Sequence, residues 1–155
     1  MCAMRLVVDS STLISLARAG LLDLLRRLPL ESVVIDTVRA ETVAGGLAAG
    51  YADAAAIEAA LAGLPVQETS PTPGSADAAV LIAAQGAGGL VANDLALGRR
   101  ARNLGLAWLR TADLVVLVVR SSVLSRREGL QALDALEAAG HLTPGLAAAY
   151  REEVG

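Results

Sequence analysis

The sequence predicts a single α/β domain built around a parallel sheet of about five strands. Short runs rich in Val and Leu alternate along the chain with segments that carry apolar residues at helical spacing, and this alternation is typical of α/β folds. The first run stops at Asp9, and a later run is followed by Asn93 and Asp94. A chain of 155 residues is most simply one domain, so residues 1–155 are expected to fold as one unit.

The first strand is expected at 6–8, where an apolar run stops at Asp9. Short continuous apolar runs are typical of parallel strands that are covered on both faces. Ser10, Ser11 and Thr12 follow and offer N-caps for a helix. Asp9 should therefore lie at the carboxyl end of a central strand, which is the edge where ligands bind in open α/β sheets.

The rest of the first half is predicted to alternate helices with two more strands. Gly20 separates the first two helices, and Pro29 stops the second. Asp36 or Thr37 is expected to cap the next helix, whose first turns carry Glu41. The elements are predicted at helices 12–19 and 21–28, strand 32–35, a helix that includes 38–42, a loop at 45–50, helix 51–61 and a weak edge strand at 64–68.

The second half opens with a rigid turn at 69–74 and a helix capped by Ser75. Asp77 falls in the first turn, where the helix dipole favours an ionised carboxylate, so it either serves a site or only improves the helix start. The next strand runs into Asn93 and Asp94, as the first runs into Asp9. The elements are predicted as a helix that residues 86–89 end, strand 90–92, helix 95–104, strand 106–109, a helix capped by Thr111 or Asp113, an ambiguous run at 115–119, and helices 128–139 and 144–152.

Charge and composition exclude several functions. The net charge of −3 argues against a protein that coats nucleic acid without specificity, because such binding depends on neutralising phosphates. Every basic side chain is Arg, which suits bidentate phosphate contacts, and many cluster after residue 95. They either bind phosphate or form a solvated, salt-bridged face; the phosphate candidates are Arg99, Arg100 and Arg102.

Missing residues exclude other classes. One Cys and one His rule out an internal disulfide and any metal site built from several Cys or His residues. The chain has no Lys, which a receiver domain needs, and no glycine fingerprint after the first strand. It also lacks an apolar run of about 18 residues, so we expect a soluble, cytoplasmic protein without a membrane span.

Four acidic residues are expected to meet at one edge of the sheet. If the first strand is central, Asp9 and Asp94 straddle the point where the strand order reverses, and Glu41 and Asp77 enter from the starts of adjacent helices. Two carboxylates about 4 Å apart repel by roughly 4 kcal/mol at an effective dielectric of 20. A hard divalent cation, Mg²⁺ or Mn²⁺, relieves this repulsion and can orient water for attack on a phosphodiester.

Four segments of the chain resemble the acidic motifs of PIN-domain ribonucleases in order and approximate spacing. The resemblance covers nearly the whole chain and rests on residues 7–14 (VVDSSTLI), 38–43 (VRAETV), 76–79 (ADAA) and 91–94 (VAND). It implies a five-stranded parallel sheet in the order 3-2-1-4-5 with helices on both faces. It also implies a Mg²⁺ or Mn²⁺ site formed by Asp9, Glu41, Asp77 and Asp94, with Ser11 orienting Asp9 and Asn93 as a second helper.

The resemblance further implies an endoribonuclease that cleaves RNA, often the VapC-like toxin of a toxin-antitoxin pair, homodimeric and silenced by a small antitoxin. A further acid that some members carry after the last strand has no clear counterpart, because Asp113 is better explained as a helix cap. Two alternatives stay open: a structure-specific DNA nuclease, and a PIN fold kept as a binding or assembly module. We expect Trp108 in the core or at a strand end, and His141 at the surface or as a cap.

Overall fold

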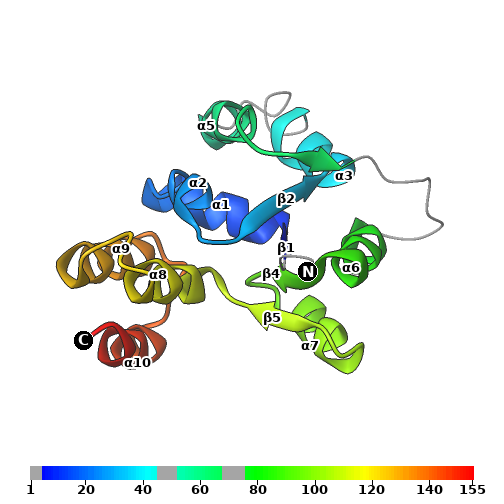
Figure 1. The fold of residues 1–155 in the computed structure, drawn as a ribbon. Coiled ribbons are helices and arrows are strands. Elements are labelled where there is room, and N and C mark those ends of the chain that lie inside the picture. Colours follow the sequence, from blue (N-terminus) through cyan, green and yellow to red (C-terminus); the bar gives the residue numbers. More distant parts are fainter. Residues whose placement is uncertain (1–4, 45–51, 68–75) are drawn as a thin grey trace.

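The computed structural model describes residues 5–44, 52–67 and 76–155. They form one α/β domain with a five-stranded parallel sheet in the order β3-β2-β1-β4-β5, which confirms the predicted fold class and strand order (Figure 1). β1 pairs with β2 on one side and with β4 on the other, so it is the central strand. The strands are β1 (Arg5–Val8), β2 (Glu31–Ile35), β3 (Val66–Gln67), β4 (Gly88–Val91) and β5 (Ala107–Leu109).

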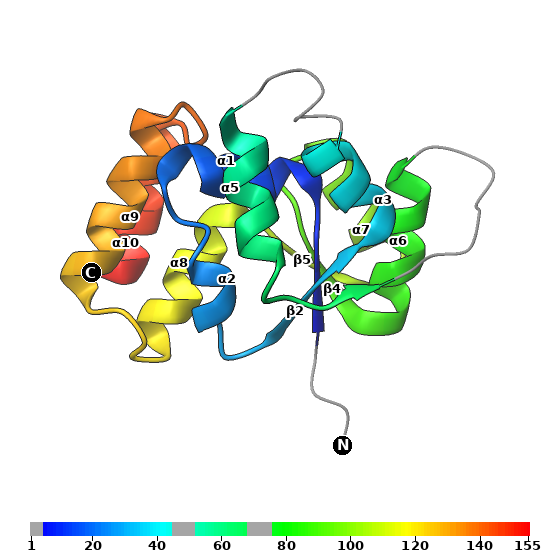
Figure 2. The ribbon, with the colours of Figure 1, turned by 90° about the horizontal axis from the view of Figure 1, so that it is seen from above.

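Helices cover both faces of this sheet, as predicted. Figure 2 shows α6 and α7 on one side and α8, α9 and α10 on the other. The helical elements are α1 (Ser10–Ala19), α2 (Leu24–Arg27), α3 (Asp36–Arg39), the π-helical turn η1 (Ala40–Ala44), α5 (Ala52–Leu61), α6 (Ala76–Ala87), α7 (Leu95–Asn103), α8 (Thr111–Arg120), α9 (Arg126–Ala138) and α10 (Pro144–Val154). Within the described ranges, no helix is long and apolar enough to cross a membrane.

The core consists of small aliphatic side chains around the central strands. Leu6, Val7 and Val8 of β1 are fully buried, and so is Leu90 of β4. The sequence contains no Phe, so Leu, Val and Ala fill the interior. Each fully buried Leu or Val contributes roughly 1.5–3 kcal/mol, and together they hold the carboxyl edge of the sheet in place.

Three predicted helix starts are wrong in their cap. Asp9 itself is the N-cap of α1, and its carboxylate accepts a hydrogen bond from the Ser11 backbone N–H. In α8 the N-cap position is Arg110, and Asp113 lies in the first turn and accepts the Arg110 backbone N–H at 2.8 Å. In α3 the N-cap is Ile35 and not Asp36 or Thr37, and Asp36 lies in the first turn and accepts the Thr37 N–H at 2.8 Å. The three differences have one cause: an acidic side chain close to a helix start satisfies whichever unpaired N–H it can reach.

Two other expectations differ in the local backbone. The helix after β2 changes from α3 to the π-helical turn η1, so Glu41 lies on a π turn and not on an α-helical one. The helix before β4 ends at Ala87, within the residues 86–89 expected to end it, but β4 begins at Gly88, earlier than the predicted strand 90–92. A φ of 110° at Gly88 allows this abrupt change of direction, because glycine has no Cβ to clash.

The remaining expectations are settled or lie outside the described residues. The ambiguous run at 115–119 is helical, within α8. Of the edge strand predicted at 64–68, the described residues 64–67 form a strand only at Val66–Gln67. The predicted loop at 45–50, the turn at 69–74 and the cap at Ser75 lie outside the described residues.

Candidate functional site

The carboxyl ends of β1 and β4 meet at one edge of the sheet. The Asp9 backbone N–H donates to the Val91 carbonyl at 3.0 Å, so the chain stays paired just beyond the end of β1. Ala92 is held in the same way, because its N–H donates to Leu109 of β5 at 3.0 Å. The residues that follow these pairs, Asn93 and Asp94, are therefore fixed next to the start of α1.

Asp9 is held by Ser11. The carboxylate of Asp9 is buried, with 6% of the residue exposed, and it accepts the Ser11 hydroxyl at 2.6 Å and the Ser11 N–H at 3.3 Å. The same hydroxyl oxygen accepts the backbone N–H of Asn93 at 3.1 Å. Since the one hydroxyl proton is donated to Asp9, Ser11 joins the ends of β1 and β4 and orients the carboxylate between them.

Three of the predicted acidic residues interact through their charges. Burial raises the pKa of Asp9, against the hydrogen bonds from Ser11, and the charge of Asp77 raises it further. Burial, followed by the charges of Asp9 and Asp77, likewise raises the pKa of Glu41. A like charge raises the pKa of a carboxyl only when it lies nearby, so Asp77 lies near enough to Asp9, and both lie near enough to Glu41, for their charges to be felt.

Glu41 reaches this region from the π turn. The neighbouring Thr42 is buried, and its hydroxyl donates to the Val38 carbonyl at 2.8 Å, which satisfies a backbone group inside the widened turn. A π turn rotates the residues that follow it relative to an α-helix, and such turns are frequent at functional sites. Glu41 lies within this turn, and its side chain is exposed.

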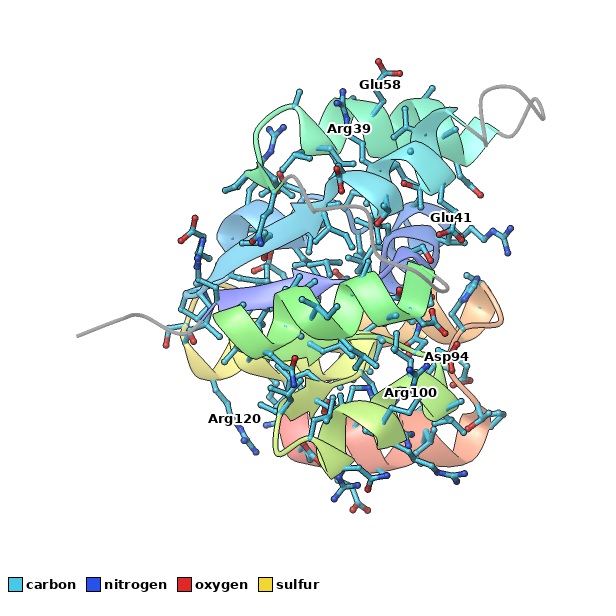
Figure 3. The ribbon with its side chains drawn as sticks, turned by 90° about the vertical axis from the view of Figure 1, so that its right-hand side faces the viewer. Arg39, Glu41, Glu58, Asp94, Arg100 and Arg120 are labelled. Atoms are coloured by element: carbon cyan, nitrogen blue, oxygen red, sulfur yellow. The ribbon has the colours of Figure 1, made fainter. Side chains whose placement is uncertain are left out.

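Asp94 is placed differently from the other three. It is exposed and acts as the N-cap of α7, where its carboxylate accepts the Leu97 N–H at 3.0 Å. Figure 3 shows Glu41 and Asp94 on the same side of the domain. As the side chains stand in the described part of the chain, no three Asp, Glu, His or Cys residues are grouped closely enough to hold a metal ion.

The three arginines proposed as phosphate contacts lie on α7, directly after Asp94. Arg99, Arg100 and Arg102 are all exposed, and within the described ranges none of them forms an ion pair with an acidic side chain. Figure 3 shows Arg100 near Asp94 in that view. The guanidinium groups therefore form the solvated face that one interpretation expects, but this face carries no ion pair within the part of the chain that the structure describes.

Asn93 was expected to assist Asp9, but its hydrogen bonds to Ser15 and, through Ser15, to His141 were not predicted. The side-chain amide of Asn93 donates to the Ser15 hydroxyl at 2.7 Å and accepts the Thr111 N–H at 3.1 Å. Ser15 in turn contacts Nδ1 of His141 at 2.9 Å, so the half-buried His141 is not a plain surface residue. Its backbone N–H donates to the Leu136 carbonyl at 3.0 Å and so caps the end of α9, as one expectation had it. The available signal was the spacing of Ser11 and Ser15, which places both hydroxyls on one face of α1.

Burial of His141, together with the nearby charge of Arg18, lowers the pKa of its imidazole. The neutral ring can accept the Ser15 hydroxyl proton at Nδ1, while the Ser15 oxygen accepts from the Asn93 amide. The chain from His141 through Ser15 thus fixes Asn93. The Asn93 backbone N–H also donates a hydrogen bond to the Ser11 hydroxyl oxygen, so this network indirectly supports the position of the Asp9 carboxylate.

The chain is similar to one protein family and to solved structures of two archaeal proteins. A family profile described as "DUF3368: PIN domain" matches residues 5–154. A PilT N-terminus domain protein from the archaeon Sulfolobus solfataricus P2 is 16% identical, with 79% of this chain and 95% of that chain covered and a TM-score of 0.47. A domain of a functionally unknown protein from Methanocaldococcus jannaschii DSM 2661 is 14% identical, with 70% and 91% covered and a TM-score of 0.51. No curated protein is detectably similar.

Proposed function

Because the chain belongs to the PIN-domain family DUF3368, we propose that it is a metal-dependent endoribonuclease. Asp9, Glu41, Asp77 and Asp94 would hold Mg²⁺ or Mn²⁺, and the substrate would be RNA. The observation that carries the proposal is that the end of the central strand places Asp9 in a buried position beside other acids: burial and then the charge of Asp77 raise the pKa of Asp9, and burial and then the charges of Asp9 and Asp77 raise the pKa of Glu41. Repulsion between carboxylates destabilises the fold when no cation is bound, and carboxyl groups with perturbed pKa values cluster at functional sites. This arrangement therefore supports a cation-binding role for these acids.

The chemistry of the donors fits a hard divalent cation. The acidic residues offer only oxygen ligands, and the one nearby histidine is turned to Ser15 through Nδ1. A bound cation would supply neutralisation of the negative charge that develops on a phosphodiester during hydrolysis. Asp94 would join the other carboxylates by giving up its hydrogen bond to the Leu97 N–H, a bond that contributes about 0.5–2 kcal/mol to the helix.

The chain's own residues would do the positioning. Ser11 holds Asp9 through one carboxylate oxygen, and the other oxygen would be the ligand to the cation. Asn93 keeps Ser11 in place from the β4 side. The exposed arginines Arg99, Arg100 and Arg102 would contact phosphates on either side of the bond that is cut, with their fork of donors matching the phosphate oxygens.

The wider role belongs to the proposal as well and rests on the sequence resemblance. We propose that the protein acts in the cytoplasm as a VapC-like toxin, forms a homodimer, and is silenced by a small antitoxin. Native mass spectrometry of protein purified from its own cells measures both points. A mass equal to one chain alone, with no smaller protein bound, would contradict this part and leave the nuclease proposal untouched.

The nuclease proposal is tested by cleavage of labelled single-stranded RNA, structured tRNA and branched DNA in Mg²⁺, Mn²⁺ or EDTA. We expect RNA to be cut only with metal, and Asp9→Asn to lose at least a hundredfold in rate while its circular dichroism spectrum is unchanged. The matched control is Asp23→Asn, because Asp23 is exposed and makes no side-chain cap bond.

Equal cleavage by wild type and Asp9→Asn would overturn the assignment of Asp9. Cleavage of branched DNA in preference to RNA would replace the substrate. If the purified protein, shown by mass to carry no partner, cuts nothing with any metal, the fold serves binding or assembly and the nuclease proposal fails.

A further inference from the structure

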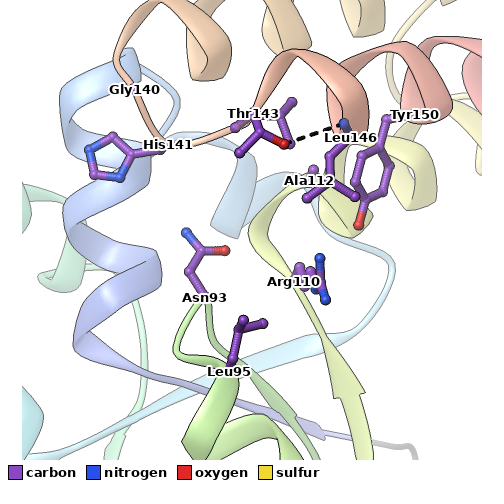
Figure 4. Close-up of a pocket in the computed structure, with 10 residues that line it drawn as sticks. Asn93, Leu95, Arg110, Ala112, Gly140, His141, Thr143, Leu146 and Tyr150 are labelled. Atoms are coloured by element: carbon purple, nitrogen blue, oxygen red, sulfur yellow. Dashed lines mark hydrogen bonds between the residues drawn. The ribbon is translucent and has the colours of Figure 1, made fainter.

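A pocket of about 320 Å³ opens beside the acidic edge (Figure 4). Its walls come from the loop between β4 and α7, the start of α8, the turn between α9 and α10, and α10 itself. The lining residues that matter here are Asn93, Leu95, Arg110, His141, Leu146 and Tyr150. A pocket of this volume lies at the small end of the range for small-molecule sites.

The pocket shares its wall with the acidic site. Asn93 and Leu95, which line it, are the neighbours of Asp94 in the chain. The Asn93 backbone donates to Ser11, whose hydroxyl donates to the Asp9 carboxylate at 2.6 Å. A nucleotide chain whose phosphate lies at the acidic edge would therefore have an adjacent base within reach of this pocket.

The pocket offers one fixed cation. The Arg110 guanidinium lies over the ring of Trp108, with 5.2 Å from its central carbon to the ring centroid. Trp108 is itself held by a hydrogen bond from its indole N–H to the Ala92 carbonyl at 2.9 Å. In the described residues Arg110 forms no ion pair, so its donors remain for a ligand.

The rest of the pocket wall favours a nucleotide base over a phosphate as the ligand. Leu95 and Leu146 are large apolar side chains on the pocket wall that are 47% and 39% exposed, which suits a flat aromatic ring and not a hydrated anion. Asp113 lies behind the Arg110 backbone and next to Tyr150, where its charge and hydrogen bond, after burial, raise the pKa of the tyrosine hydroxyl. The Asp113 carboxylate would repel a phosphate in the pocket, but it would not repel an uncharged base.

We propose that this pocket binds a guanine base next to the bond that is cut, with Arg110 donating to O6 and N7. The inference rests on the proposed ribonuclease function and names a specificity residue for it. Arg is a donor-only fork, and the two neighbouring acceptors on one edge of guanine are the arrangement that it pairs with most often. Adenine presents a donor beside its acceptor on that edge, and it would leave half of the fork unpaired.

Trp108 is the only tryptophan in the chain, so its fluorescence reports on Arg110 directly. The test is a titration of metal-free protein in EDTA with GMP, AMP, CMP and UMP. We expect GMP to change the emission and to bind about tenfold more tightly than the other three. Arg110→Lys keeps the charge but loses the fork, and it should bind all four nucleotides with similar affinity.

The control is Arg120→Lys, which changes an exposed arginine at the other end of the same helix and should keep the preference for GMP. Leu146→Glu is a second variant, at an exposed position of the pocket wall, and it should lower the affinity for all four nucleotides by a similar factor. The proposal is overturned if wild type binds GMP no better than AMP, if no nucleotide binds, or if Arg110→Lys keeps the preference.

The same proteins separate this inference from the function on which it rests. In the RNA cleavage assay, sequencing of the product ends should find guanine next to the cut for wild type and for Arg120→Lys, but not for Arg110→Lys. Binding of GMP without any RNA cleavage would support the base pocket and reject the nuclease. Metal-dependent cleavage without GMP binding or base preference would reject the pocket and keep the nuclease.

Discussion

Gly98, in the middle of α7, lies directly under Trp108. A methyl group added there would overlap three atoms of the indole ring, so either the helix or the ring has to move. Overpacking of this kind costs about 1–3 kcal/mol, while alanine gains up to about 1 kcal/mol of helix propensity over glycine. We therefore expect Gly98→Ala to lower the free energy of unfolding by about 1–2 kcal/mol, or roughly 2–8 °C in Tm.

The paired control is Gly86→Ala in α6, where an added methyl meets no atom within 4 Å. Propensity alone acts at this exposed position, so a gain of up to about 0.5–1 kcal/mol is expected. Urea unfolding followed by circular dichroism measures both variants on one scale. If the two substitutions shift stability in the same direction, or if Gly98→Ala is as stable as wild type, the contact between α7 and Trp108 is not as described.

Three further predictions concern stability in EDTA, measured by urea unfolding. Folding raises the pKa of Asp9, so the wild type loses stability as this group ionises between about pH 4 and 7, and Asp9→Asn does not. The stability of Asp9→Asn relative to wild type should therefore increase over this pH range; a difference that does not depend on pH would contradict this. Folding lowers the pKa of His141, so below about pH 6.5 the imidazole is protonated more readily in the unfolded chain and the wild type loses stability. His141→Gln should not show this loss; an unchanged pH profile would refute it. Leu133→Ala, at a fully buried site in α9, should cost about 2–5 kcal/mol, and a loss under 1 kcal/mol would refute its packing.

The parts of the fold that follow from local pattern were predictable. Leu6 to Val8 are buried on both faces of the sheet, so the apolar run alone placed Asp9 at the end of a central strand. The same holds for the strand before Asn93 and Asp94. Asp77 was placed in the first turn of its helix, where α6 has it.

The parts that depend on contacts between distant segments were not predictable. The bond from His141 to Ser15 joins residues 126 positions apart, and nothing in the sequence around His141 indicates it. The π turn at Glu41 and the position of Trp108 over Gly98 likewise depend on how one helix packs against its neighbours. Tertiary packing decides such details, whereas spacing along the chain decides only which face a residue occupies.

The central claim is that the acidic edge holds a divalent cation. Electron paramagnetic resonance measures free Mn²⁺ directly during a titration of the metal-free protein, without any substrate. We predict that wild type and Asp23→Asn bind Mn²⁺ with the same affinity, and that Asp9→Asn and Glu41→Gln each weaken binding at least tenfold, about 1.4 kcal/mol. Equal Mn²⁺ affinity in wild type and Asp9→Asn, or no binding by wild type at millimolar metal, would contradict the claim.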